Sequence, residues 1–125
     1  MRILVTGGAG FIGSSLCERL VAMGNRVVAL DSMFRGSEAN LESILGSENF
    51  ALYAGDVRDV DALDACVEAL GGLDLVYHLA AINGTKWFHE AAHSVIDVNV
   101  NGTLRTLETA MAHDAKYVFA SSPEA

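Results

Sequence analysis

The sequence predicts an α/β fold with a doubly wound parallel sheet whose strands are ordered 3-2-1-4-5. Short apolar runs alternate along the chain with longer segments in which apolar residues recur at helical spacing. Strands and helices that alternate in this way form right-handed crossovers, which place helices on both faces of a parallel sheet. With 125 residues and a mass of 13.2 kDa, the chain is expected to form one domain spanning residues 1–125.

The first half of the chain predicts three strands. Residues 2–6 (RILVT) form a short apolar run that ends in glycines, and Ile12, Leu16 and Leu20 then predict a helix that stops at Gly24-Asn25. Residues 26–30 (RVVAL) predict a second strand, which ends at Asp31. Residues 36–46 carry a weaker helical stripe, and residues 50–54 predict the third strand.

The second half predicts two more helices and two more strands. Apolar residues at helical spacing from Val60 to Leu70 precede Gly71-Gly72, and residues 73–79 (LDLVYHL) predict the fourth strand. A longer helix is expected over residues 93–113, followed by a fifth strand at residues 116–120. On this helix, four apolar residues share one side: Ile96, Val100, Leu107 and Met111. The open edge of strand five calls for another segment, another chain or a truncation of the fold.

Composition excludes several classes of protein. Sixteen acidic against eight basic residues give a net charge of -8, and no cluster of Lys and Arg is present, so we expect no nucleic-acid partner. No apolar run approaches the roughly 20 residues that cross a bilayer, and glycines interrupt the short apolar N-terminus, so no membrane partner and a cytoplasmic location are expected. Cys17 and Cys66 fall within helical apolar patterns and are expected to be buried and unpaired.

A glycine-rich turn joins the first predicted strand to the first predicted helix. The stretch from Thr6 to Gly13 reads TGGAGFIG, with glycines at 7, 10 and 13 and a second G-x-G-x-x-G frame at 8, 10 and 13. Such glycines permit positive φ, close approach of a pyrophosphate, and tight packing of helix on strand. We therefore predict that this turn, with Phe11 and Ile12 at the helix start, binds a dinucleotide. The alternative is a turn that merely links strand to helix.

Asp31 strengthens the prediction and indicates which dinucleotide binds. It stands 18 residues after Gly13, at the end of the second predicted strand, where a carboxylate can accept hydrogen bonds from the adenosine ribose. Because the same carboxylate would repel a 2′-phosphate, the cofactor is expected to be NAD, with NADP disfavoured. Arg35 lies close enough in sequence to weaken that preference.

Six motifs, in order, resemble those of the extended short-chain dehydrogenase/reductases, the NAD-dependent family that includes nucleotide-sugar epimerases, dehydratases and decarboxylases. They are TGGAGFIG (6–13), Asp31, GDVRD (55–59), HLAA (78–81), NVNGT (99–103) and FASSPEA (119–125). The resemblance covers essentially the whole chain. It implies a Rossmann domain with NAD as cofactor, a nucleotide-sugar substrate in the complete enzyme, and the N-terminal part of that enzyme only.

The resemblance also implies cofactor contacts beyond the glycine turn. Asp56 and Val57 match an acidic and apolar pair that binds adenine, although an acid in this position also serves as a turn or helix cap. Leu79, Ala80 and Ala81 match the residues that run beside the dinucleotide, where close packing alone would also favour small side chains. A further match is Asn99, which corresponds to a helix asparagine that holds the active site; the alternative is an ordinary polar helix residue.

Two candidate catalytic residues follow the fifth predicted strand. Ser122 matches a Ser/Thr that hydrogen-bonds the reacting sugar, and Glu124 matches a position that is acidic in dehydratases. Pro123 replaces the aspartate that usually precedes that acid, which argues against a dehydratase. The alternative for both residues is a polar strand end leading into a loop.

The family's Tyr-x-x-x-Lys pair, in which lysine lowers the tyrosine pKa for general acid/base work, is not found. The three tyrosines, Tyr53, Tyr77 and Tyr117, are followed four positions later by Val57, Ala81 and Ser121. We therefore expect a truncated or shortened relative that binds cofactor better than it converts sugar. A non-catalytic NAD(P)-binding or regulatory module is the alternative, and a homo-oligomer is left open.

A competing motif predicts a zinc peptidase. Residues 89–93 read H-E-A-A-H, which on one helix places His89 and His93 a turn apart to bind zinc, with Glu90 as general base. The extended version of that motif fails, because Ile96-Asp97 and Asn99 occupy the positions where it requires Gly and His. We treat this interpretation as a remote alternative and expect no metal.

Overall fold

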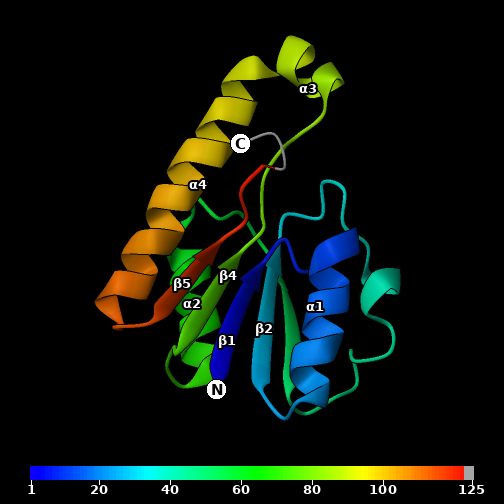
Figure 1. The fold of residues 1–125 in the computed structure, drawn as a ribbon, viewed down its shortest axis with the longest axis vertical. Helices are drawn as coiled ribbons and strands as arrows, with labels where there is room; N and C mark the ends of the chain where they lie inside the picture. Colours follow the sequence, from blue (N-terminus) through cyan, green and yellow to red (C-terminus); the bar gives the residue numbers. More distant parts are fainter. Residues whose placement is uncertain (123–125) are drawn as a thin grey trace.

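The computed structural model describes residues 1–122 as alternating strands and helices (Figure 1). The predicted strand–helix alternation is confirmed over this range. In chain order the elements are β1 (Arg2–Thr6), α1 (Phe11–Ala22), β2 (Arg26–Asp31), the 3₁₀ helix η1 (Glu38–Leu41), β3 (Phe50–Ala54), α2 (Val60–Leu70), β4 (Leu75–His78), α3 (Thr85–Glu90), α4 (Ala92–Ala112) and β5 (Lys116–Phe119).

All five strands pair in parallel, in the order β3-β2-β1-β4-β5, as predicted. Thr6 at the end of β1 is in register with Leu30 of β2 on one side and His78 of β4 on the other. The chain thus runs outward from β1 in one direction and then returns to β1's other side. In a doubly wound sheet, ligands bind in the crevice outside the carboxyl ends of the strands at such a reversal.

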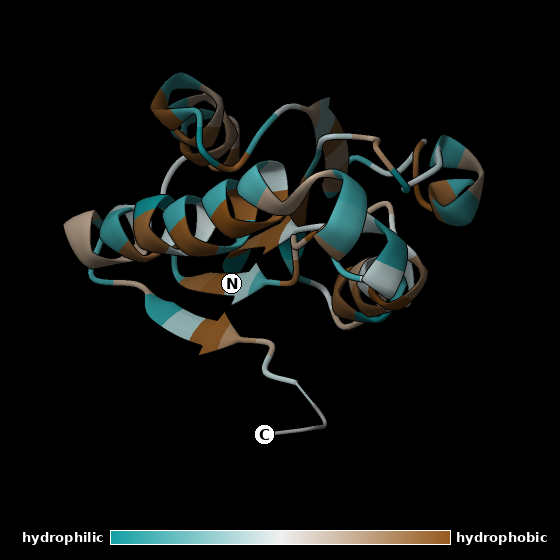
Figure 2. Ribbon diagram, turned by 90° about the horizontal axis from the view of Figure 1, so that it is seen from above, coloured by the Kyte–Doolittle hydropathy of each residue, from teal (hydrophilic) through white to brown (hydrophobic). Residues whose placement is uncertain are grey.

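Apolar residues on both faces of the strands hold two helical layers against the sheet. One core cluster joins Ile3 and Val5 to Cys17 of α1 and Leu41 of η1. The other joins Leu4 and alternate residues of β2 and β4 to α2 and to Ala110 of α4. The helices carry hydrophobic and hydrophilic residues in alternating bands, as expected for helices with one buried side (Figure 2).

Cys17 and Cys66 are buried and unpaired, as predicted, one in each core cluster. Burial raises the pKa of Cys17 to about 12 and that of Cys66 to about 11, because the thiolate loses its hydration. Both residues therefore act as small apolar side chains within the core.

Three elements differ from expectation. The segment expected as a weak helix over 36–46 forms only the short η1, followed by turns that still bury Leu41 and Ile44. The fourth strand is shorter, at Leu75–His78, and an unpredicted helix, α3, precedes α4. Gly84, with φ of 106°, redirects the chain into α3.

The outer face of α4 is the largest departure from a simple amphipathic helix. The four residues whose spacing predicts this helix, Ile96, Val100, Leu107 and Met111, are all exposed. The residues buried against the rest of the fold are instead Val95, Gly102, Thr106 and Ala110. Within residues 1–122, no helix combines the length and apolar character needed to span a bilayer.

Candidate functional site

The turn between β1 and α1 is shaped by glycines that leave no space for a side chain. Gly7 adopts φ of 71°, and a Cβ there would lie 2.9 Å from the backbone nitrogen of Ala80. At Gly13 a Cβ would lie only 2.1 Å from the Gly7 carbonyl oxygen. The two glycines therefore bring β1, the start of α1 and the segment after β4 together at one point.

Of the two glycine frames, the structure favours 7, 10 and 13 as the one that shapes the turn. Gly8 packs into the core instead, since its Cβ would lie 2.5 Å from the Ala29 side chain. Gly10 is the N-cap of α1 and supplies no side-chain cap. The first turn of α1 thus starts with backbone amides that no capping side chain satisfies, while the side chains of Phe11 and Ile12 are exposed.

Asp31 lies at the end of β2, beside the glycine turn. Its carboxylate is buried and accepts hydrogen bonds from the Ala9 amide at 2.9 Å and the Met33 amide at 2.8 Å. These two bonds hold the turn and the loop after β2 against each other. A carboxylate offers about four lone-pair positions, so two are left for further donors.

Two loops from opposite sides of the β1 reversal meet above the sheet. The Phe34 ring, after β2, lies edge-on to Trp87 of α3, with ring centroids 5.0 Å apart. One residue on, Arg35 donates to the side-chain oxygen of Asn83 at 3.1 Å. The loop after β2 and the β4–α3 loop are therefore linked across the carboxyl edge of the sheet.

Asp56 is held by an ion-pair network at the end of β3. Arg58 donates to its Oδ1 from the backbone amide at 2.8 Å and from Nε at 2.9 Å, and to its Oδ2 from Nη2. Arg58 also pairs with Asp97 of α4. The hydrogen bond from Arg58 lowers the pKa of Asp56, so this carboxylate remains charged.

Val57 has a packing role that the sequence does not reveal. Its side chain is buried against α4, where a Cβ on Gly102 would lie 2.6 Å from Val57 Cγ2. Close contact at this glycine, together with the Arg58–Asp97 pair, joins the β3–α2 loop to α4.

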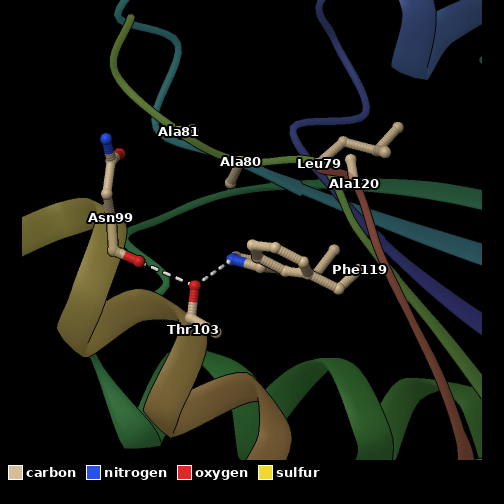
Figure 3. Close-up of a pocket in the computed structure, with 8 residues that line it drawn as sticks. Leu79, Ala80, Ala81, Asn99, Thr103, Phe119 and Ala120 are labelled. Carbon is tan, nitrogen blue, oxygen red and sulfur yellow. Dashed lines mark hydrogen bonds between the residues drawn. The ribbon is translucent and has the colours of Figure 1, made fainter. Parts of the chain in front are cut away.

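A cavity of about 200 Å³ lies at the carboxyl ends of β4 and β5 (Figure 3). It brings together four residues expected at the site, Leu79, Ala80, Ala81 and Asn99. Thr6 Oγ1 accepts from the amides of both Leu79 and Ala80 at 3.1 Å, which holds this segment close to β1. The remaining lining residues are His78, Thr103, Phe119 and Ala120.

Asn99 clamps the backbone of the same segment from α4. Its side-chain oxygen accepts from the Ile82 amide at 2.8 Å, and its side-chain nitrogen donates to the Ile82 carbonyl at 3.0 Å. Its own carbonyl accepts from the Thr103 hydroxyl at 2.7 Å, one of the two bonds drawn at Thr103 in Figure 3.

Thr6, His78 and Thr103 lie beside the predicted residues and have no individual role among the predictions from sequence. His78 is buried between the two threonines, 2.7 Å from Thr6 Oγ1 and 3.2 Å from Thr103 Oγ1. Burial lowers the pKa of His78 to about 4, since a charged imidazole is poorly solvated there. In the sequence, each of the three residues belongs to one of the family motifs, at 6–13, 78–81 and 99–103, but no spacing connects the three.

The predicted catalytic residues lie at the end of the described chain. Ser122 is exposed and follows β5 on the same edge of the sheet as the cavity. Glu124 lies outside the described residues.

The zinc motif does not form the arrangement that its chemistry requires. Ala91, with φ of -142°, separates α3 from α4, so His89 and His93 belong to different helices. Among residues 1–122, no three His, Cys, Asp or Glu side chains group closely enough to hold a metal ion. The geometry therefore gives the peptidase alternative no support.

Comparison with known proteins identifies the family. Residues 3–125 match the NAD dependent epimerase/dehydratase family. Over 123 residues the chain is 37% identical to UDP-N-acetyl-alpha-D-glucosaminuronate decarboxylase of Bacillus cytotoxicus and 40% identical to UDP-glucose 4-epimerase of Mycolicibacterium smegmatis. Among solved structures, the Thermus thermophilus UDP-glucose 4-epimerase in complex with NAD superimposes with a TM-score of 0.83 at 34% identity.

These relatives are much longer than the present chain. The alignments cover 98% of this chain in each case, but 37% of the decarboxylase, 39% of the mycobacterial epimerase and 38% of the Thermus chain. The chain therefore corresponds to somewhat more than a third of each relative.

Proposed function

The chain belongs to the NAD dependent epimerase/dehydratase family, and from that premise we propose that residues 1–125 bind NAD for an enzyme that acts on a nucleotide-linked sugar. The observation that carries the proposal is the glycine turn, where Gly7 and Gly13 have no space for a Cβ and the first amides of α1 have no capping side chain. Such a helix start suits a pyrophosphate, because its amides and its dipole both favour an anion.

The adenosine half of the cofactor is proposed to lie at the carboxyl ends of β2 and β3. Asp31 keeps two lone-pair positions beyond its bonds to Ala9 and Met33, and these are available to ribose hydroxyls. Asp56 accepts three hydrogen bonds from Arg58, which leaves one position on Oδ2 for the adenine amine. The buried side chain of Val57 supplies an apolar neighbour for the ring.

A preference for NAD over NADP follows from charge at the end of β2. A 2′-phosphate would be placed near the Asp31 carboxylate, and like charges repel. Arg35, the nearest cation in sequence, donates to Asn83 rather than to Asp31. We therefore propose that Arg35 does not offset the carboxylate.

The other half of the cofactor is proposed to run along Leu79, Ala80 and Ala81 into the cavity between β4, β5 and α4. When bound, the nicotinamide supplies hydride chemistry, taking a hydride from a sugar carbon and usually returning it. Ser122, on the same edge of the sheet, is proposed to hydrogen-bond the reacting sugar, with Glu124 as a second polar group.

A non-catalytic cofactor-binding or regulatory module is the second candidate. It is favoured by one observation, that none of the three tyrosines is followed four residues later by a lysine. The two candidates agree on NAD binding and differ on turnover.

Calorimetric titration with NAD and NADP tests the proposed function. The native chain is expected to bind NAD at least about tenfold more tightly than NADP, which corresponds to about 1.4 kcal/mol. Asp31→Asn is expected to weaken NAD binding and to narrow the ratio between the cofactors. Equal affinity of the native chain for both cofactors would contradict the role of Asp31.

Two controls separate cofactor binding from folding in this experiment. Asp31 also accepts from two backbone amides, so urea unfolding of each variant shows how much stability is lost. Asp64→Asn removes the same charge from an exposed position on α2. This variant is expected to bind NAD and NADP with the affinities of the native chain.

A further inference from the structure

His78 lies at the centre of a hydrogen-bond chain that crosses three elements. It ends β4 and is buried between Thr6, which ends β1, and Thr103 of α4. Nδ1 lies 2.7 Å from Thr6 Oγ1, and Nε2 lies 3.2 Å from Thr103 Oγ1. Both ring nitrogens therefore have partners, and these partners determine the direction of each bond.

The partners of Thr6 determine the first direction. Its hydroxyl accepts hydrogen bonds from the amides of Leu79 and Ala80, each at 3.1 Å, and the Leu79 amide is shared with the Thr6 carbonyl oxygen at 3.2 Å. A hydroxyl has two lone pairs and one proton, so both lone pairs are used and the proton points to Nδ1 of His78. Nδ1 must therefore be the acceptor, and the neutral ring carries its proton on Nε2.

The second direction follows from the first. Nε2–H donates to Thr103 Oγ1, and the Thr103 hydroxyl donates in turn to the Asn99 carbonyl at 2.7 Å. With the proton on Nδ1 instead, two donors would face each other at Thr6, a buried conflict that costs about 1–3 kcal/mol. Only the tautomer with its proton on Nε2 thus satisfies every hydrogen bond from Thr6 to Asn99.

The hydrogen bonds around His78 act on the segment that lines the cavity. Residues 79 and 80 are held by Thr6, and residue 82 is held by the Asn99 side chain. The position of Asn99 is tied through its carbonyl and Thr103 to the imidazole. His78 therefore connects the two supports of the cavity wall.

We propose that His78 is a positioning residue: as the neutral imidazole with its proton on Nε2, it couples β1 to α4 and so fixes residues 79–82 along the cavity. The coupling itself stands on the geometry of residues 6 to 103. Its effect on cofactor affinity rests on the proposed function. The groups packed on the ring, from β1, β5 and α4, are Thr6, Tyr117, Phe119 and Thr103, and none carries a charge at neutral pH.

The tautomer is tested first, by long-range ¹H–¹⁵N spectra of the cofactor-free chain. The chain has four histidines, and His89, His93 and His113 are exposed. Loss of one signal set in His78→Gln assigns His78. That set is expected to show a fixed Nε2–H tautomer from pH 7.5 to 5.5. A protonated Nδ1 on His78 anywhere in this pH range would overturn the proposal.

The coupling is tested with a matched pair on α4. Thr103→Val removes the hydroxyl at nearly constant shape, and Thr103→Ser keeps it. In the Thr103→Val variant, hydrogen exchange of the Leu79, Ala80 and Ile82 amides is expected to accelerate at least tenfold, and the His78 Nε2 signal is expected to shift. The Thr103→Ser variant is expected to show the native exchange rates and the native signal. Equal exchange in the two variants would show that α4 packs without positioning the segment.

NAD titration then gives the functional readout. Thr103→Val is expected to bind NAD about tenfold more weakly and Thr103→Ser within twofold of native. Val67→Ala removes two methyl groups from the core beneath α2, away from the hydrogen bonds of His78. It is the control for a loss of NAD affinity caused only by lower stability of the fold. If both Thr103 variants bind like native, His78 does not position the cofactor wall. If the native chain binds no NAD, the proposed function fails, while the spectra and exchange rates still decide the coupling.

Discussion

Single atoms decide whether the crevice beside the glycine turn can form, and the glycines of the turn show this most clearly. At Gly13 the missing Cβ allows α1 to begin against the Gly7 carbonyl, and at Gly7 the positive φ turns the chain beneath Ala80. The pattern of glycines after an apolar strand is local, so the sequence predicts it. The partners of His78 are not local: Thr6 lies 72 positions away and Thr103 lies 25 positions away. No periodicity or motif spacing reports such contacts.

Gly13→Ala is expected to abolish tight NAD binding and to lower the free energy of unfolding by about 3 kcal/mol. Alanine normally stabilises a helix relative to glycine by about 1 kcal/mol, but here its Cβ would lie 2.1 Å from the Gly7 oxygen, which is backbone and cannot rotate away. Urea unfolding and calorimetry measure both effects. Gly46→Ala, where a Cβ meets no atom within 4 Å, is the control; equal behaviour of the two variants would contradict the steric account.

His78 is expected to make the fold acid-sensitive. Its pKa is about 4 in the folded protein and 6.5 as the reference, so the unfolded chain takes up the proton first as pH falls. Stability is therefore full above about pH 6.5 and is lost toward pH 4, by about 2 kcal/mol between pH 7 and 5. The same loss in His78→Gln, measured by urea unfolding at both pH values, would refute this assignment. Asp56 and Asp97, with lowered pKa values, are common to both proteins and cancel in the comparison.

Among the elements, α4 shows how far a periodic pattern can be trusted. Apolar spacing from Ile96 to Met111 correctly predicts a long helix, but those side chains face outward. The side that packs on the fold is built from Gly102, Thr106 and Ala110, because small residues let the helix approach closely. Hydropathy therefore predicts that a helix exists; which face meets the sheet depends on shape and hydrogen bonding. η1 is a similar case, since Leu41 and Ile44 are buried without a regular helix.

Gly102→Ala is expected to destabilise the fold by about 1–3 kcal/mol, because its Cβ would lie 2.6 Å from Val57 Cγ2. In a Val57→Ala background that methyl group is gone, so the same substitution is expected to cost almost nothing or to stabilise α4 by up to about 1 kcal/mol. A double-mutant cycle by urea unfolding measures the coupling. Additive effects of the two substitutions would mean that Gly102 and Val57 do not set the distance of α4.

At the scale of the whole molecule, the alternation of strands and helices, with a glycine turn after the first strand, is typical of a doubly wound dinucleotide fold and predicts the strand order. The parallel arrangement follows because each connection is long enough to cross the sheet, and such crossovers between parallel strands have one hand. Coverage of the sheet is less predictable: within residues 1–122, β5 has one strand neighbour, β4, and Val118 and Phe119 are exposed. The relatives are more than twice as long as this chain, so the surfaces that their further residues contact cannot be inferred from residues 1–125.

Residues 1–125 are expected to bind NAD without converting a nucleotide sugar at an ordinary rate. Removal of a proton from a sugar hydroxyl needs a general base, which contributes about 10²- to 10⁴-fold. No tyrosine here has a lysine four residues later, and both nitrogens of His78, the buried histidine of the described chain, are hydrogen-bonded. Incubation with UDP-glucose and NAD, followed by NMR of the sugar protons, is expected to show turnover at least a thousandfold below about 10 s⁻¹. The Mycolicibacterium smegmatis UDP-glucose 4-epimerase is the positive control. Turnover by this chain at the control's rate would mean that a base other than tyrosine serves the reaction.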